Sequence, residues 1–331
     1  MGLPCQNKYY HFMHKTITLF LTQFILLTAT ASPILFDHVV HSNKINPASL
    51  VISNDTFQLP DDFPTIADTA SGSNPYAVIA GGSKGIGYAI AEALARRGYN
   101  LVLIARHLDS LIATKKKLES TYPIHVEVLQ MDLAKDESAA AIAQWCTEKN
   151  IRLKILCNVA GLGGSNDYLS LPLDSLRYMI NLNIGSCMAL SLTLLPLLEK
   201  NAPSFILNVA SMAGLAPIPT KNMYSATKSA VVFFSYSLRY QLKNKNISVS
   251  VLCPGPVYTK PEIVEYTKRN LGWLGKQMAI SPKWVGEIAV RKTLKGKLMI
   301  VPGGVSKIMA FFVRILPPRW LVAIYYKLGS K

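Results

Sequence analysis

From Tyr76 onward, short apolar runs alternate with longer segments of helical periodicity. Runs that are apolar throughout are typical of parallel strands that helices cover on both faces. We expect strands at 76–80, 100–105, 125–132, 153–160, 204–210, 247–254 and, as a candidate last strand, 297–303. We expect helices at 85–98, 107–122, 137–150, 174–200 and 222–245. This order predicts an α/β fold, a doubly wound parallel sheet whose ligand lies at the carboxyl ends of the strands.

The N-terminal end does not follow this pattern. Residues 1–31 contain an apolar stretch that leads to Ala29-Thr30-Ala31, the layout of a secretory signal peptide or a membrane anchor. The alternative is a non-native extension from a wrongly assigned start, in which case Met13 is a candidate start and the protein is cytoplasmic. Residues 32–74 carry Asn, Ser, Asp and Pro without periodicity, which predicts a linker.

The C-terminal tail, residues 305–331, holds two apolar pieces separated by Pro317-Pro318, each too short to span a bilayer. The chain carries a formal charge of +16, and the part from Pro254 onward contains 14 Lys and Arg against 3 Asp and Glu. A nucleic-acid partner is not expected, because no nucleic-acid-binding motif accompanies the charge. We expect a membrane-associated protein whose tail contacts an anionic membrane surface; a lid over a substrate site and ordinary core packing are the alternatives.

The five cysteines, Cys5, Cys146, Cys157, Cys187 and Cys253, form no CxxC pair. Four of them lie in apolar segments. We therefore expect buried free thiols rather than a disulfide set or metal ligands.

Residues 79–87 read IAGGSKGIG, directly after the first strand and before the first helix. Glycine at Gly81, Gly85 and Gly87 lets the backbone and a helix N-terminus approach a pyrophosphate. A tight turn that needs positive φ is the simpler reading, and the two are compatible.

Four more motifs follow in order: NVAG at 158–161, NIG at 183–185, VASMAG at 209–214 with YSATK at 224–228, and CPGPVYT at 253–259. With the glycine spacing, they resemble the short-chain dehydrogenase/reductase family over residues 75–303. The resemblance implies a single Rossmann-type catalytic domain, expected at 75–304, and a homo-oligomer. Ala80, Val159 and Ala210 depart from residues common in the family, all at supporting positions.

The resemblance implies a nicotinamide cofactor. An NAD enzyme usually places an acid after the second strand, where this chain has Ala105 followed by Arg106. Arg106 and Lys84 can pair with a 2′-phosphate, so we expect NADP(H). The cofactor-binding residues implied are Gly81, Ser83, Lys84, Gly85, Ile86, Gly87, Arg106, Asp132, Asn158, Tyr224, Lys228, Pro254, Gly255, Val257 and Thr259.

The implied catalytic residues are Asn183, Ser211, Tyr224 and Lys228. Tyr224 and Lys228 are four residues apart on an expected helix, so they share a face. The ammonium and an oxidised nicotinamide are expected to lower the pKa of the phenol, which then exchanges a proton with the substrate oxygen. Ser211 is expected to hydrogen-bond the reacting carbonyl, and Asn183 to support Lys228 through a water.

We therefore expect an NADPH-dependent carbonyl reductase or alcohol dehydrogenase. Residues 260–284 are expected to form an apolar lid that favours a small hydrophobic, lipid-like ketone, with an acyl chain or a steroid skeleton. The lid's apolar residues are Tyr266, Leu271, Trp273, Leu274, Met278 and Trp284. The alternatives are a 3-oxoacyl-thioester reductase and, from another class, a non-catalytic NADP-binding sensor or membrane-tethered interaction protein. No metal site is expected.

Overall fold

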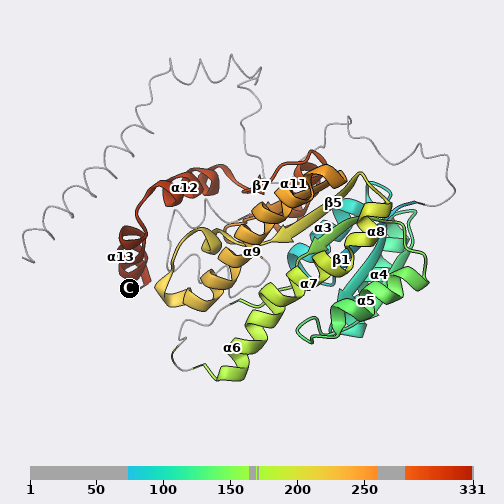
Figure 1. The fold of residues 1–331 in the computed structure, drawn as a ribbon, viewed down its shortest axis with the longest axis horizontal. Coiled ribbons are helices and arrows are strands. Elements are labelled where there is room, and N and C mark those ends of the chain that lie inside the picture. Colours follow the sequence, from blue (N-terminus) through green and yellow to red (C-terminus); the bar gives the residue numbers. More distant parts are fainter. Residues whose placement is uncertain (1–73, 164–168, 170, 259–279, 330–331) are drawn as a thin grey trace, which may run out of the picture. The chain divides into compact units, whose positions relative to one another are not determined.

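Among the residues that the computed structural model describes, 74–163, 169, 171–258 and 280–329, seven strands form one parallel sheet. Its order is β3-β2-β1-β4-β5-β6-β7, and Figure 1 shows the sheet with helices packed around it. The strands are β1 (Tyr76–Ala80), β2 (Asn100–Ala105), β3 (Val126–Gln130), β4 (Leu153–Asn158), β5 (Ser204–Val209), β6 (Ile247–Leu252) and β7 (Met299–Ile300). The chain crosses from β3 at one edge to β4 beside β1, so the order reverses there, and ligands of such sheets bind at this point. The predicted fold class is confirmed.

Helices cover both faces of the sheet. They are α3 (Gly85–Ala95), α4 (Leu108–Thr121), α5 (Ser138–Glu148), α6 (Leu173–Ile180), α7 (Ser186–Thr193), α8 (Leu195–Lys200), α9 (Asn222–Gln241), α11 (Pro282–Leu294), α12 (Gly304–Ile315) and α13 (Pro318–Gly329). Successive strand residues point to opposite faces. In β1, Ala77 and Ile79 therefore join a core with α3, α4 and α11, whereas Val78 and Ala80 join a core with α5, α7, α8 and α9.

The long helical stretch expected at 174–200 is present but is not one regular α-helix. The segment divides into α6, a π-helical turn (Asn181–Gly185), α7 and α8. Pro196 lies in the first turn of α8, where its missing N–H is tolerated, and it prevents a continuous helix across this point. The π turn places Asn183 in the interior, and such turns often occur at functional sites. The last strand, expected at 297–303, is shorter in the structure, because only Met299 and Ile300 pair with β6.

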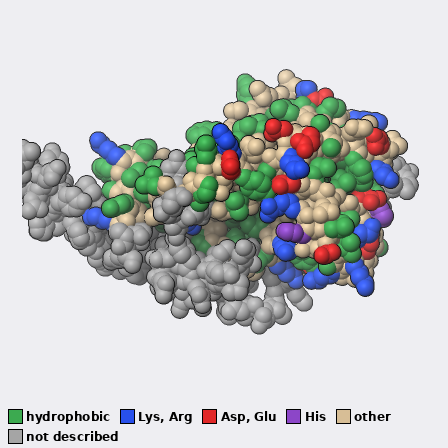
Figure 2. Space-filling view, turned by 90° about the horizontal axis from the view of Figure 1, so that it is seen from below, with side chains coloured by type: hydrophobic (Ala, Val, Ile, Leu, Met, Phe, Trp, Pro, Cys, Tyr) green, Lys and Arg blue, Asp and Glu red, His purple; other side chains and the backbone are tan. Residues whose placement is uncertain are grey.

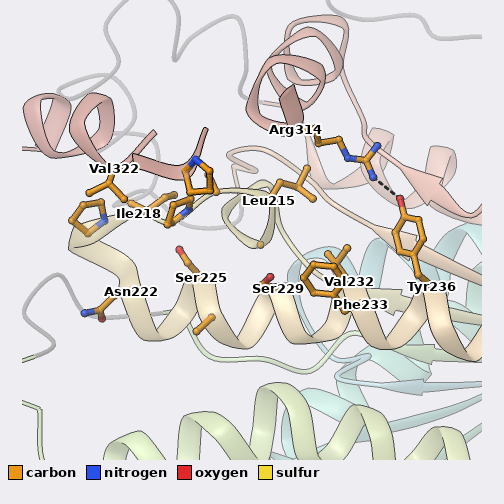
Figure 3. A pocket seen from close by; sticks show the side chains of 16 residues that line it. Leu215, Ile218, Asn222, Ser225, Ser229, Val232, Phe233, Tyr236, Arg314 and Val322 are labelled. Carbon is orange, nitrogen blue, oxygen red and sulfur yellow. Dashed lines mark hydrogen bonds between the residues drawn. The ribbon is translucent and has the colours of Figure 1, made fainter. Parts of the chain in front are cut away.

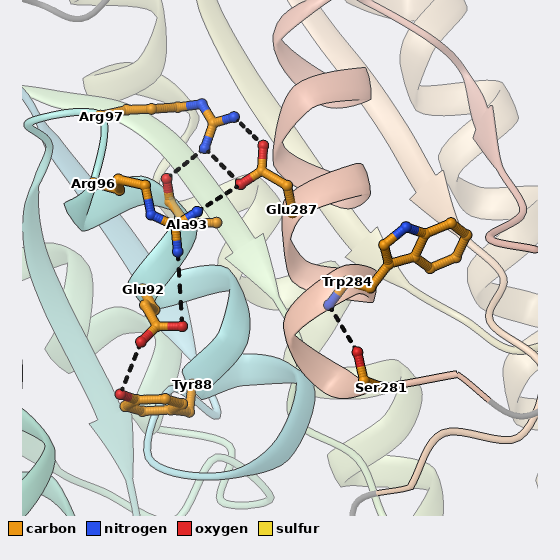
Figure 4. A network of polar contacts seen from close by, with 8 residues as sticks. All are labelled: Tyr88, Glu92, Ala93, Arg96, Arg97, Ser281, Trp284 and Glu287. Atoms are coloured by element: carbon orange, nitrogen blue, oxygen red, sulfur yellow. Dashed lines mark hydrogen bonds and ion pairs between the residues drawn. The ribbon is translucent and has the colours of Figure 1, made fainter. Parts of the chain in front are cut away.

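Helices α3 and α11 pack closely and are joined by charge. A Cβ on Gly286 would lie 2.4 Å from the Ala89 backbone, so glycine permits the approach. The buried Glu287 carboxylate pairs with Arg97, whose Nη1 lies 3.0 Å from Oε2, and with Arg96 at 3.4 Å (Figure 4). This network fixes α11 over the helix that follows the glycine loop.

The C-terminal tail folds as α12 and α13. Val313 and Leu321 pack against Ala216 in a small separate cluster. Several apolar side chains of these two helices are exposed: Ile308, Phe311, Ile315, Trp320, Val322 and Tyr326. At the left end of the surface in Figure 2, where these helices lie, hydrophobic and basic side chains gather. Neither helix contains Asp or Glu.

No helix in the described part of the chain is long and apolar enough to cross a membrane. The expected signal or anchor at 1–31 and the linker at 32–74 lie outside the described residues, except for Asn74. Cys146, Cys157, Cys187 and Cys253 are buried free thiols, as predicted, and Cys5 lies outside the described residues.

Candidate active site

The glycine loop joins β1 to α3 and has the shape of a phosphate cradle. Gly81 has φ +92°, and a Cβ on Gly87 would lie only 1.9 Å from the Gly81 carbonyl oxygen. The loop begins beside β2, because Gly81 N donates to the Ile104 carbonyl oxygen at 2.8 Å. Lys84 precedes α3 and its side chain does not cap the helix. The first backbone N–H groups of α3 therefore suit an anion, and the loop fits the pyrophosphate of a dinucleotide.

Two exposed cations, Lys84 and Arg106, follow β1 and β2. Arg106 Nη1 donates to the Tyr178 hydroxyl at 2.7 Å, and that hydroxyl donates to Asp132 Oδ1 at 3.1 Å. Asp132 also accepts from Ala134 N at 3.1 Å, as a turn-capping residue does. Tyr178 was not predicted, because it lies on α6 and nothing in the local sequence indicates this contact. It holds the Arg106 guanidinium near Asp132, another of the predicted cofactor-binding residues.

Asn158 ends β4 with its side chain in the interior. Its Nδ2 donates to Asn208 Oδ1 at 2.8 Å, and Asn208 Nδ2 donates to Ser235 Oγ at 3.0 Å. These bonds tie β4 to β5 and to α9, as expected for a residue that joins neighbouring strands. Its predicted part in cofactor binding stays a prediction.

The four predicted catalytic residues come from three places. Ser211 follows β5, Tyr224 and Lys228 lie on α9, and Asn183 lies in the π turn. Lys228 Nζ donates to the Val209 carbonyl oxygen at 2.9 Å and lies 6.0 Å from the centroid of the Tyr224 ring. The α9 spacing thus places the ammonium beneath the phenol at the end of β5.

Asn183 is held by its own set of partners. Its Nδ2 donates to Thr227 Oγ1 at 3.0 Å and to the Leu162 carbonyl oxygen at 3.0 Å, while its Oδ1 accepts from Leu162 N at 2.7 Å. Thr227, directly before Lys228, was not predicted as a partner. These bonds connect the π turn to α9 and to the segment after β4.

Burial dominates the ionisation of the two α9 residues. It raises the pKa of the Tyr224 phenol, and hydrogen bonding with Ser211 opposes that rise. Burial also lowers the pKa of Lys228 to about 8. The expected lowering of the phenol pKa by the Lys228 ammonium together with a bound oxidised nicotinamide stays a prediction. With its pKa raised, the phenol carries its proton at neutral pH and can donate it.

A family model described as short chain dehydrogenase matches residues 75–269. The chain belongs to this family. The match starts where the sequence predicted it to start, and the predicted family is confirmed.

Relatives of this short-chain dehydrogenase include lipid-related enzymes. It is 34% identical over 189 residues to very-long-chain 3-oxoacyl-CoA reductase-A of Danio rerio, covering 56% of this chain and 59% of that protein. It is 31% identical over 272 residues to human (Homo sapiens) 17-beta-hydroxysteroid dehydrogenase type 3, covering 77% of this chain and 84% of that protein. The chain thus spans less than two thirds of the first relative and most of the second.

Among solved structures, a short-chain dehydrogenase from Sphingobium yanoikuyae in complex with NADPH is similar to this chain. The sequence identity is 27% and the TM-score is 0.62, over 77% of this chain and 94% of that one.

The remaining predicted residues of this short-chain dehydrogenase follow β6. The Pro254 carbonyl oxygen accepts from Met212 N at 3.0 Å, which joins this segment to the one after Ser211. Gly255 is half-buried and Val257 is buried, pairing with Ile280. Thr259 and the expected lid residues up to Met278 lie outside the described residues. Trp284, the other lid candidate, begins α11 and packs against the core.

Proposed function

We propose that this chain is an NADP(H)-dependent reductase of a carbonyl group on a lipid-like substrate. The observation that carries the proposal is the grouping of Tyr224, Ser211 and Lys228 at the carboxyl end of β5. Burial keeps Tyr224 protonated, and its partner Ser211 lies beside it. Such a pair can orient a carbonyl oxygen and give it a proton.

Each residue has a separate part in the reaction. When bound, the reduced nicotinamide supplies the hydride that the substrate carbon accepts. The Tyr224 hydroxyl donates its proton to the carbonyl oxygen, and the Ser211 hydroxyl hydrogen-bonds the same oxygen. The Lys228 ammonium, near the phenol, stabilises the tyrosinate that is left and would hold the nicotinamide ribose. Asn183 keeps α9 in position through Thr227.

The preference for NADPH rests on charge at the ends of β1 and β2. Arg106 and Lys84 are exposed there, and Ala105 stands where an acid would repel a 2′-phosphate. The complex of the Sphingobium yanoikuyae relative with NADPH supports this choice.

Among substrates, a long-chain 3-oxoacyl thioester is the first candidate. The relatives named very-long-chain 3-oxoacyl-CoA reductase support it. A steroid ketone is the second candidate, because the relative named 17-beta-hydroxysteroid dehydrogenase type 3 matches over more of its length.

The experiment follows NADPH oxidation by the purified chain with a long-chain 3-oxoacyl-CoA and with a 17-ketosteroid, each also with NADH. We expect turnover with NADPH and the thioester. A chain that binds NADPH but oxidises it with neither substrate would instead be the non-catalytic NADP-binding protein of the alternative hypothesis.

We also propose that the chain works as a homo-oligomer at an anionic membrane surface. The exposed apolar side chains of α12 and α13 and the absence of acids in these helices support the membrane contact. The oligomer follows from the family resemblance.

A further inference from the structure

A cavity of about 850 Å³ lies on the outer face of α9. The segment from Gly214 to Pro219 and the helices α12 and α13 form its other walls (Figure 3). Its lining is mostly apolar and includes Leu215, Ile218, Val232, Phe233 and Val322. We call it the α9 cavity. Its size and lining suit an elongated apolar ligand.

The α9 cavity is not the site of the reacting groups. Ser225, Ser229 and Tyr236 lie at i, i+4 and i+11 and present one face of α9 to the cavity. Tyr224 and Lys228 are absent from its lining, and Lys228 Nζ bonds the Val209 carbonyl oxygen of β5. The same helix thus serves the candidate active site with one face and the cavity with another.

A buried polar atom faces the α9 cavity without a partner. Ser225 is 4% exposed, and its Oγ has no hydrogen-bond partner among the described residues. Figure 3 shows the Ser225 oxygen directed into the cavity, with Ser229 one turn further along the helix. A water bound in the cavity can satisfy this buried hydroxyl beside an apolar ligand.

A cation stands at one end of the α9 cavity. Arg314 of α12 is exposed and donates through Nη2 to the Tyr236 hydroxyl. It makes no ion pair with any acid in the described part of the chain. A guanidinium with free N–H groups suits a carboxylate, which it can bind through two hydrogen bonds.

We propose that the α9 cavity binds a long-chain fatty acid anion, with its carboxylate at Arg314 and its chain along α9 toward Asn222. The helix rises about 21 Å from Asn222 to Tyr236, so the cavity accommodates an extended chain. This site is separate from the proposed catalytic function and does not depend on it.

The test titrates the full-length chain with a fluorescent long-chain fatty acid and with its methyl ester. Arg314→Gln keeps a polar side chain beside Tyr236 but removes the charge. We expect it to weaken binding of the acid at least about ten-fold and to leave binding of the ester nearly unchanged. Arg319→Gln, which removes an exposed cation outside the lining, is the matched control and should bind like the wild type.

A second variant fills the space. Ser229→Phe should abolish binding of both probes, while retained NADPH binding shows that the variant folds. Tyr224→Phe should bind the acid like the wild type, so loss of catalysis and loss of this site are distinguishable. The proposal is overturned if the wild type shows no saturable binding, or if Arg314→Gln and Arg319→Gln bind the acid equally well.

Discussion

The Lys228 ammonium lies 6.0 Å from the centroid of the Tyr224 ring and donates to the Val209 carbonyl oxygen at 2.9 Å. One helical turn of α9 thus places a buried cation beside a half-buried phenol. Burial raises the pKa of Tyr224 and lowers that of Lys228 to about 8. Near neutral pH both groups carry their protons, which is the state that carbonyl reduction needs.

This pairing predicts the pH dependence of reduction. Tyr224 remains protonated well above pH 8 because its pKa is raised. Lys228 loses its charge as the pH rises through about 8, so kcat/KM should be level below that pH and fall above it. Lys228→Arg keeps the charge, and the fall should move to higher pH in whatever activity this variant retains. A wild-type profile that stays level to the alkaline limit of stability would show that the Lys228 charge is not required.

Arg106 should determine cofactor preference. Removing one charged hydrogen-bond partner costs about 1.5–3 kcal/mol, so Arg106→Ala should weaken NADPH binding about ten- to hundred-fold and barely change NADH binding. Tyr178→Phe is the control, because it removes only the hydroxyl that Arg106 contacts and keeps the Arg106 charge. NADPH binding should therefore weaken less in this variant than in Arg106→Ala. Fluorescence titration gives the affinities, and equal NADH and NADPH affinities in the wild type would refute the assignment.

The Glu287 network should carry much of the stability of the α3–α11 contact. Glu287→Ala removes the carboxylate from a buried Arg97 and should lower the free energy of unfolding by about 3–5 kcal/mol. Lys245→Gln breaks the exposed pair with Glu199 and should cost at most about 1 kcal/mol. Denaturant unfolding compares the two variants. If both variants lost similar free energy of unfolding, the buried pair would stabilise the protein no more than the exposed pair does.

The tail should contact lipid through the exposed side of α12. A chain that starts at Ser71 excludes the N-terminal apolar segment and should sediment with anionic vesicles, less so at high salt. Replacing Phe311 and Ile315 by Gln should reduce sedimentation, because both are exposed. Leu192→Gln changes an exposed apolar residue of α7 and should have no effect. If the shortened chain stays in the supernatant at low salt, the tail is not a membrane contact.

The sequence predicted β1 and β2 best because their apolar runs are almost fully buried, whereas β3 is mostly half-buried. The bounds expected for β1 and β2 agree with the structure. Ser211, Tyr224 and Lys228 come from motifs that follow β5 in the sequence, and they lie together at the end of that strand. Local sequence patterns are enough to predict this grouping, because the carboxyl ends of the strands in a parallel sheet all lie at one edge.

Other features depend on contacts between distant residues. The sequence predicts a long helical stretch at 174–200 but not the π turn within it that holds Asn183. Tyr178 contacts Arg106 across 72 positions of sequence. The rise in the Tyr224 pKa follows from burial, which the sequence does not measure.

The most direct test of the account is the turnover of Tyr224→Phe with NADPH and a long-chain 3-oxoacyl-CoA. The substitution removes the proton donor and keeps the ring. We predict that kcat falls at least about 100-fold while NADPH binds with unchanged affinity. Turnover of this variant close to the wild-type rate would contradict the account, because the proton would then come from another group.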